Sequence, residues 1–282
     1  MDNNAVLNRI FTQATLKELI ENFSTDNAYF SVIKRIIVNP ESKENGQIIS
    51  EIYEYLKNDY RNEYFYKNTL LNKLLLGVHK PTTTTALAEI SVGKSKADFI
   101  LINGRAVVYE IKTGLDTFER LRTQLQDYYK AFDHVVVLTD EKNQKTILKI
   151  LEDSPVGVYL MTKRNQIKKL KEPVCCSNFL SLSEMFKILN KDEFENILIY
   201  QYKYLPDVPP VHYYKKCKEM FCALDLTLAY SLFLEQLKRR NKIIKESYKD
   251  VPYELKTLVY FSRYKENDYN KLQDFLKTYY KE

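Results

Sequence analysis

The sequence predicts an α/β protein in which a mixed β-sheet is flanked by helices, with N-terminal helices before it and an all-α unit after it. Apolar residues recur at helical spacing in the first quarter of the chain, short β-rich runs follow from about residue 88, and helical spacing returns after Pro173. The chain has 282 residues, 45% of them hydrophobic, with 6 Gly and 8 Pro. A chain of this size and composition can bury its own core, which excludes disordered and low-complexity architectures.

The N-terminal helices are predicted from two periodic segments, 4–23 and 47–76, in which apolar side chains lie three or four positions apart. The segment 77–85 ends this pattern, because Pro81 and four consecutive threonines disfavour a helix. We expect these helices to form the helical part, 1–80, of a first domain that spans 1–172.

The α/β core of this domain is predicted over 81–172. Two helices, at 115–132 and 144–152, interrupt its β-rich runs. One helix between the third and fourth strands implies a crossover connection within a mixed sheet. The expected strands are 88–92, 97–102, 106–111, 135–139, 156–161 and 166–170.

A second, all-α domain is predicted over 173–282, because helical spacing resumes there and prolines separate the periodic segments. Its helices are expected at 182–189, 193–204, 212–242 and 253–264.

The composition of the chain limits the classes of protein to which it can belong. The longest apolar stretch, 220–234, is shorter than the ~20 residues of a membrane span, and the polar N-terminus lacks the pattern of a signal peptide. We therefore expect a cytoplasmic protein with no membrane partner. The net charge of +6 comes from a general excess of lysine, so charge alone does not indicate nucleic-acid binding.

The cysteines and histidines predict no metal cluster. Cys175 and Cys176 are adjacent, and the other two cysteines would lie about 140° apart around a helix, which does not suit an iron–sulfur cluster. We expect reduced thiols, a loop position for His79 and a strand-start position for His134.

Charged residues lie at the end of a strand that should be buried. The apolar run 106–111 contains Glu110, and Lys112 lies on the same side of the strand because side chains alternate. Asp98, on the preceding strand, offers a second carboxylate. Mg²⁺ prefers carboxylate oxygens, and a nearby cation can orient water and offset phosphate charge. The pattern indicates metal-dependent phosphodiester hydrolysis.

These residues resemble a known motif. Asp98 followed by Glu110-Ile111-Lys112 resembles the core of the PD-(D/E)XK nuclease superfamily, and Gln124 with Tyr128 resembles the QxxxY motif of its RecB-like branch. The resemblance covers about residues 63–170 and departs from the pattern at Ala97, where the superfamily's name has proline.

The resemblance implies a restriction-endonuclease-like fold and a divalent-metal site. It implies Mg²⁺ or Mn²⁺ as cofactor and Lys112, Gln124 and Tyr128 as further residues of the catalytic site. The metal ligands that it implies are Glu63, Asp98, Glu110 and Ile111.

The site sets a geometric condition on the loop between the two strands. A two-residue turn at Asn103 and Gly104 would put Asp98 and Glu110 on opposite faces of the sheet. A three-residue loop pairs Ile102 with Ala106 and sets Asp98 across from Glu110. We therefore expect an odd-length loop or a bulge.

Either Glu63 or Glu89 could supply the third carboxylate of the metal site. Glu63 lies in the last helix before the strands, although it could instead form a surface pair with Lys67 at i,i+4. Glu89 lies in the first strand.

Nucleic-acid contacts are expected from Arg120, one helical turn before Gln124, and from the basic cluster Lys238, Arg239 and Arg240. For the cluster, a favourable interaction with the carboxyl end of its own helix is an alternative explanation.

The function we expect is a metal-dependent nuclease that cuts DNA and prefers free ends or single strands. The resemblance is to nuclease-like proteins of phage, mobile-element or defence settings. The alternative is a catalytically silent protein of the nuclease fold that binds a protein partner, through the C-terminal helical domain, or nucleic acid. RNA is a third, weaker substrate class. The sequence does not separate endonuclease from exonuclease action or monomer from dimer.

Overall fold

The protein divides into two compact units, seen here in a computed structural model that describes residues 3–21, 27–78, 83–240, 246–262 and 264–281. Unit 1 combines Met1–His79 with Lys242–Glu282, and unit 2 is Lys80–Asn241. This division differs from the expected boundary after residue 172. The helices that follow the sheet belong to unit 2 because they complete its core, and the last 41 residues belong with the N-terminal helices.

Unit 2 is built on a mixed sheet of six strands among the described residues, in the order β1-β2-β3-β4-β5-β6. The first three strands are antiparallel neighbours, β3–β4 and β4–β5 are parallel, and β5–β6 is antiparallel. The crossover between the third and fourth strands is therefore confirmed. The strands are β1 (Thr85–Val92), β2 (Ser95–Asn103), β3 (Arg105–Lys112), β4 (His134–Asp140), β5 (Gly157–Met161) and β6 (Ile167–Lys171).

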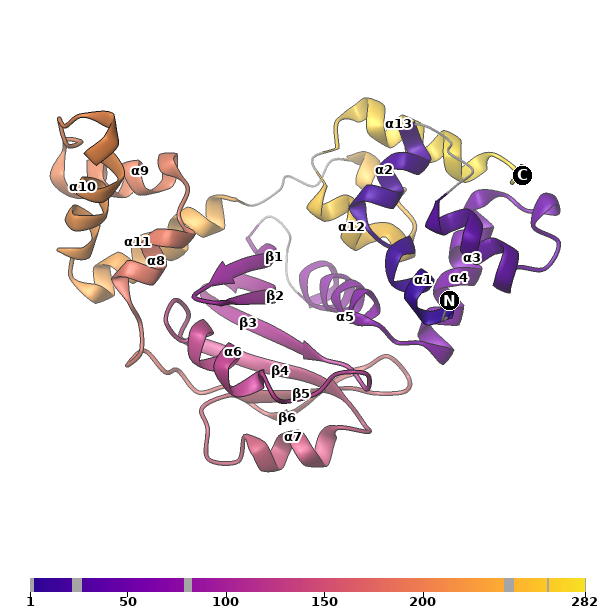
Figure 1. Ribbon diagram of the computed structural model, residues 1–282, viewed down its shortest axis with the longest axis horizontal. Coiled ribbons are helices and arrows are strands. Elements are labelled where there is room, and N and C mark those ends of the chain that lie inside the picture. The colour runs from indigo at the N-terminus through magenta and orange to yellow at the C-terminus, as the bar shows by residue number, and fades with distance from the viewer. Residues whose placement is uncertain (1–2, 22–26, 79–82, 241–245, 263, 282) are drawn as a thin grey trace. The chain divides into compact units, whose positions relative to one another are not determined.

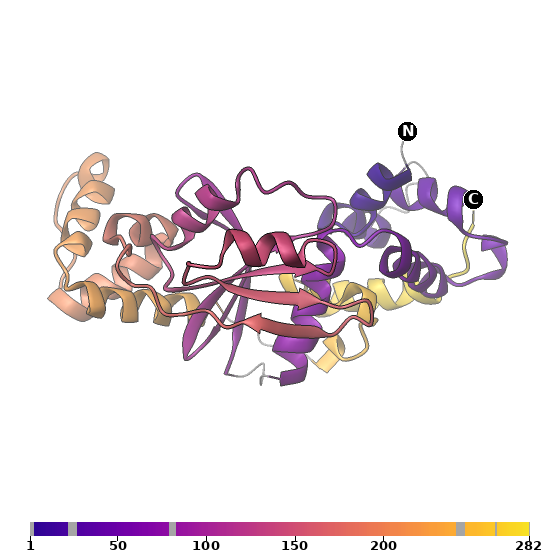
Figure 2. The ribbon, with the colours of Figure 1, turned by 90° about the horizontal axis from the view of Figure 1, so that it is seen from below.

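Helices cover one face and one edge of this sheet. The crossover helix α6 (Leu121–Tyr128) lies against β2, and α7 (Gln144–Ile150) lies against β4 and β5 (Figure 1). The next four helices gather at one end of unit 2, where α8 and α11 contact β1 (Figures 1 and 2). They are α8 (Leu182–Ile188), α9 (Lys191–Tyr202), α10 (Pro210–Cys222) and α11 (Leu226–Arg239). A mixed α/β fold with a helical C-terminal region is thus confirmed.

The single helix expected at 212–242 is replaced by two helices, α10 and α11. The helix expected at 212–242 is interrupted before Asp225, whose carboxylate accepts a hydrogen bond from the Leu228 N–H at 3.0 Å and caps the start of α11. The crossover helix is also shorter than the predicted 115–132, and its first turn begins only at Leu121.

Unit 1 is helical in its described residues, and its elements come from both ends of the chain. The side chain of Asn45 joins these ends: its amide donates to the carbonyls of Phe275 (3.1 Å) and Thr278 (2.9 Å), and its oxygen accepts from the Tyr29 hydroxyl (2.7 Å). The helices are α1 (Asn3–Ile10), α2 (Gln13–Glu21), α3 (Ala28–Ile36), α4 (Asn45–Asp59), α5 (Glu63–Leu70), α12 (Lys256–Phe261) and α13 (Glu266–Lys277).

Polar caps interrupt the long helices expected in unit 1. The Thr12 hydroxyl accepts from the Thr15 N–H at 3.2 Å where α2 begins, and the Asn62 side chain accepts from the Phe65 N–H at 3.2 Å where α5 begins. After α5 the chain continues as a wider π-helical segment, Leu71–Val78. Within the described ranges, no helix combines the length and the apolar character needed to cross a membrane.

Candidate active site

The loop between β2 and β3 brings two carboxylates to neighbouring positions. Ile102 pairs with Ala106 and Asn103 with Arg105, so the turn is centred on Gly104, which has a φ of +73°. This is the odd-length connection that the sequence predicts, and a positive φ suits glycine. Continued along the strands, the register sets Asp98 across from Glu110.

Glu110 lies at the centre of a buried polar network. Its side chain is 1% exposed, its Oε1 lies 2.8 Å from the Lys112 Nζ, and its Oε2 accepts from the Tyr128 hydroxyl at 2.5 Å. The Lys112 Nζ also donates to the Gln124 Oε1 at 2.9 Å. The structure therefore brings Glu110, Lys112, Gln124 and Tyr128 together on the face of the sheet that α6 covers.

The charges of this network hold one another in place. Lys112 is 8% exposed, so Glu110 and Lys112 form a buried ion pair, and removal of one partner would leave the other charge uncompensated. Burial raises the pKa of Tyr128 well above its usual range, and the carboxylates of Glu110 and Asp98 add to this rise. Tyr128 therefore stays protonated and acts as a hydrogen-bond donor.

Asp98 is oriented by the backbone of the strand beside it. Its Oδ2 accepts from the Ile111 N–H at 2.7 Å, immediately after Glu110 in the chain. Ile111 thus contributes its amide to the position of Asp98, and its assignment as a metal ligand remains a prediction.

Glu89 extends the row of carboxylates onto β1. Ala88 pairs with Phe99 and Ile90 with Ala97, so Glu89 stands across from Asp98, and a carboxylate oxygen of each lies within 4.8 Å of the other. Glu89 has a φ of +58°, a conformation rarely adopted by residues other than glycine. Its Oε2 also pairs with the Lys96 Nζ at 2.8 Å.

Glu63 is placed at the first turn of α5, in unit 1. Its Oε1 lies 2.5 Å from the Lys67 Nζ, and its side chain is 54% exposed. This is the i,i+4 surface pair that the sequence left open as an alternative, and the metal-ligand assignment of Glu63 remains a prediction.

The carboxylates of unit 2 are of the ligand type that a divalent metal takes, and oxygens of Glu89 and Asp98 lie within 4.8 Å of each other, whereas the oxygens of Glu89, Asp98 and Glu110 do not all lie within that distance. Glu89, Asp98 and Glu110 offer carboxylate oxygens from three adjacent strands, which is the ligand type that Mg²⁺ and Mn²⁺ prefer. Each oxygen of Glu110 accepts one donor from the protein, and a carboxylate has about four acceptor positions in all, so capacity for a cation remains.

Comparison with known proteins gives one family. The family model described as "Bacteriophage P4 protein cII" matches residues 56–268, which include all of unit 2. The chain belongs to this family. No curated protein and no solved structure matches the chain.

In this cII-family chain, α6 carries a residue that sequence reasoning missed. Asp127, inside the Gln124–Tyr128 segment, accepts from the Lys94 N–H (3.0 Å), the Ser95 hydroxyl (2.8 Å) and the Lys130 ammonium (2.6 Å). Burial alone would raise the pKa of Asp127, but the hydrogen bonds from Lys130, Ser95 and Lys94 lower it. These contacts tie α6 to the turn between β1 and β2.

Glycine is required in that turn. Gly93 has a φ of +61°, and a Cβ atom there would lie 2.6 Å from the Asp127 Oδ1. The i,i+3 spacing of Asp127 and Lys130 was visible in the sequence, but nothing in it connected Asp127 with a turn more than thirty residues earlier.

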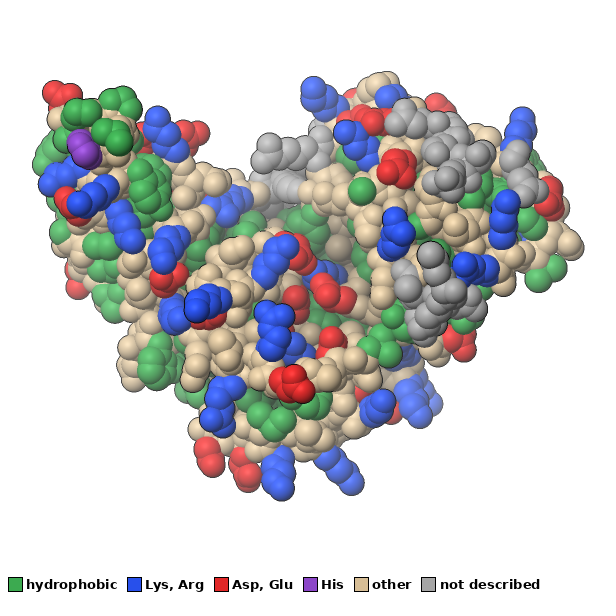
Figure 3. Space-filling view, in the orientation of Figure 1, with side chains coloured by type: hydrophobic (Ala, Val, Ile, Leu, Met, Phe, Trp, Pro, Cys, Tyr) green, Lys and Arg blue, Asp and Glu red, His purple; other side chains and the backbone are tan. Residues whose placement is uncertain are grey.

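The basic residues expected to contact nucleic acid differ in their exposure and in their partners. Arg120 is exposed and immediately precedes α6, and Lys238 is exposed near the end of α11. Arg239 pairs with Glu235 at 2.6 Å on the surface. Basic and acidic side chains are interspersed over the face shown in Figure 3.

Arg240 has structural partners. Its guanidinium donates to both carboxylate oxygens of Glu193 at 2.5 Å and to the Ile188 carbonyl at 2.8 Å. A two-pronged contact of this kind holds α11 to the start of α9, so Lys238 and Arg239 are the better candidates of the cluster for phosphate contacts.

Proposed function

We propose that this protein is a PD-(D/E)XK-type nuclease that uses Mg²⁺ or Mn²⁺ to hydrolyse phosphodiester bonds in DNA. The observation that supports the proposal is the buried network in which Glu110 and Lys112 of β3 contact each other and Tyr128 and Gln124 of α6. Asp98 of the adjacent strand accepts from the N–H of Ile111, between Glu110 and Lys112. Glu110 is a buried carboxylate and Asp98 on the adjacent strand is half-buried, and neighbouring carboxylates of this kind are what a metal-dependent hydrolase needs.

Each residue has a separate task in this proposal. Bound at the carboxylates, a divalent metal would offset phosphate charge and activate water. Tyr128 and the Ile111 N–H hold the carboxylates of Glu110 and Asp98 in place. Lys112, oriented by Glu110 and Gln124, places a positive charge where the phosphate and the attacking water would lie.

The family supports a phage setting for this activity, since its description names a bacteriophage protein. DNA in the cytoplasm would be the substrate, and free ends or single-stranded regions would be preferred, because a QxxxY helix beside the site resembles enzymes that act on strand ends. Exposed Arg120 and Lys238 would contact phosphates.

A cleavage assay tests the proposal. Purified full-length protein is incubated with linear duplex, closed circular duplex, single-stranded DNA and RNA, with Mg²⁺, Mn²⁺ or EDTA. We expect cleavage of linear or single-stranded DNA that requires the metal and is lost in Glu110→Gln but kept in Glu219→Gln, an exposed carboxylate on α10. Equal cleavage by parent and Glu110→Gln would place the activity elsewhere, and no cleavage of any substrate would overturn the proposal.

A second candidate function is protein binding without catalysis. The observation in its favour is a set of exposed apolar side chains on α9, α10 and the loop between them: Ile199, Tyr200, Tyr204, Val211 and Tyr214. In this case Ile199→Ser with Val211→Ser would abolish complex formation with a protein partner, whereas Glu110→Gln would have no effect on it.

A further inference from the structure

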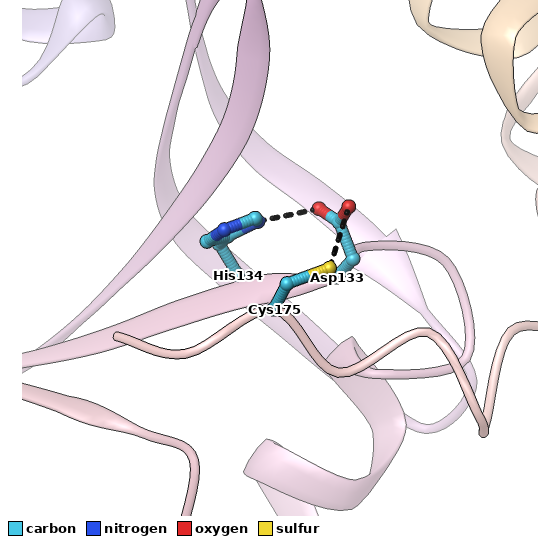
Figure 4. A group of neighbouring side chains, drawn as sticks. All are labelled: Asp133, His134 and Cys175. Carbon is cyan, nitrogen blue, oxygen red and sulfur yellow. Dashed lines mark hydrogen bonds and ion pairs between the residues drawn. The ribbon is translucent and has the colours of Figure 1, made fainter. Parts of the chain in front are cut away.

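Three side chains of different chemistry meet at the beginning of β4. Asp133 immediately precedes this strand, His134 is its first residue, and Cys175 comes from the segment after β6 (Figure 4). Their ligating atoms, a carboxylate oxygen, an imidazole nitrogen and the thiol sulfur, all lie within 4.8 Å of one another. In the sequence His134 and Cys175 looked unrelated, because forty residues separate them.

Asp133 is the centre of the group. Its Oδ1 lies 2.8 Å from the His134 Nδ1, and the Cys175 thiol donates to its Oδ2 at 3.6 Å. Figure 4 shows the imidazole and the thiol converging on the same carboxylate. The imidazole and the thiol therefore both point toward the Asp133 carboxylate, one toward each oxygen.

Neighbouring groups fix this arrangement before any ligand binds. The Tyr230 hydroxyl of α11 donates to the Asp133 Oδ1 at 2.7 Å, and the Cys176 N–H donates to the Asp133 carbonyl at 2.8 Å. His134 is buried and paired with Val107 in the sheet. Hydrogen bonds of this kind orient ligands in metal sites.

The group is separate from the candidate active site. His134 pairs with Val107 of β3, whereas Glu110 pairs with Val137 of β4. Three residues along parallel strands correspond to about 10 Å. One ion cannot serve both groups.

We propose that Asp133, His134 and Cys175 bind one Zn²⁺ ion. Imidazole nitrogen, thiolate sulfur and carboxylate oxygen are the zinc ligands of proteins, while Mg²⁺ and Ca²⁺ take oxygen ligands. On binding, the Cys175 thiol releases its proton to solvent and a sulfur–zinc bond replaces its hydrogen bond to Asp133, while neutral His134 binds the ion through the ring nitrogen that carries no proton. Cys175 is exposed, which gives the ion a path of entry.

The ion would join the segment after β6 to the sheet. Cys175 comes from that segment, and Asp133 and His134 belong to the start of β4. Zinc would thus act as a structural clamp, and three protein ligands leave a fourth position for water.

Zinc binding is measured on the metal-stripped, full-length protein in an Asp98→Asn background, so that the candidate active site does not contribute. Titration with ZnCl₂ alone should show one ion per chain. Cys175→Ser should weaken binding on the order of 100-fold, since loss of even a hydrogen-bond partner of a ligand costs about 10–100-fold. Cys176→Ser, a change at the adjacent cysteine, should leave it unaltered.

Cobalt provides a spectroscopic readout of thiolate ligation. Co²⁺ added to the Asp98→Asn protein should produce a thiolate-to-cobalt charge-transfer band that Zn²⁺ abolishes and that Cys175→Ser lacks. The proposal is overturned if fewer than one Zn²⁺ binds per chain, if the cobalt band is absent, or if Cys176→Ser weakens zinc binding as much as Cys175→Ser.

Discussion

Two adjacent tyrosines of the crossover segment differ in what their hydroxyls contact. The Tyr128 hydroxyl donates to the buried Glu110 carboxylate, whereas the Tyr129 hydroxyl is buried without a hydrogen-bond partner among the described residues. We expect Tyr128→Phe to lower the free energy of unfolding by about 2 kcal/mol, because a hydrogen bond to a charged group is lost. Urea denaturation measures this change.

Tyr129→Phe is the matched control. It removes a buried hydroxyl that makes no hydrogen bond, so the stability should stay the same or rise. Equal losses in the two variants would mean that the Tyr128 contact does not stabilise the fold.

At the scale of single residues, the sequence predicted which face of a strand a side chain occupies better than it predicted the hydrogen bonds and ion pairs of that side chain. Strand alternation predicted Glu110 and Lys112 on one side, where they form an ion pair, and the predicted odd-length loop is confirmed because Ile102 pairs with Ala106. The ion pair between Glu110 and Lys112 and the donation from the Ile111 N–H to Asp98 depend on local backbone geometry and on the docking of α6, which no sequence pattern specifies.

At the scale of elements, the link between α6 and the β1–β2 turn depends on one ionised carboxylate. Hydrogen bonds lower the pKa of Asp127 in the folded state below its unfolded value of 3.8. Their contribution to stability is therefore complete above about pH 5 and is lost as the pH falls through the folded-state pKa. Asp127→Asn should destabilise the protein at pH 7 by about 1–3 kcal/mol and much less at pH 3.

Chemical denaturation of both proteins at the two pH values measures this difference. If Asp127→Asn lowers the free energy of unfolding equally at pH 3 and pH 7, the negative charge of Asp127 does not stabilise the protein.

The strands and the crossover were predictable at this scale because β-rich runs and their alternation are local signals. The ends of the helices were harder to predict. The apolar pattern 212–242 continues through Asp225, but the carboxylate of that residue caps α11 and ends the single helix there. Regular strand alternation would put Leu87 and Ile90 on opposite faces, yet both pack against the same core because the positive φ of Glu89 breaks the alternation between them.

At the scale of the whole molecule, unit 1 depends on contacts between the two ends of the chain. Asn45→Ala removes hydrogen bonds to Tyr29, Phe275 and Thr278, and we expect a loss of about 2–4 kcal/mol from unit 1 because buried polar groups are left unpaired. Hydrogen–deuterium exchange should rise in α3, α4 and α13 and stay unchanged in the sheet.

Asn58→Ala, at an exposed position on the same helix, is the control and should leave exchange unchanged. Exchange that rises equally in the sheet of unit 2 would contradict the division into two units. This division was beyond sequence reasoning, because periodicity reports which face of a helix is buried and not which distant segment covers it.

We propose that Asp98 and Glu110 belong to one metal-dependent hydrolytic site. The most direct test is the Mg²⁺-dependent cleavage rate of end-labelled single-stranded DNA for the parent, for Asp98→Asn and for Asp207→Asn, a matched change at an exposed loop position of unit 2. We expect cleavage by the parent and by Asp207→Asn, and a rate lower by on the order of 100-fold or more in a folded Asp98→Asn. Cleavage by Asp98→Asn at the parental rate would contradict this proposal.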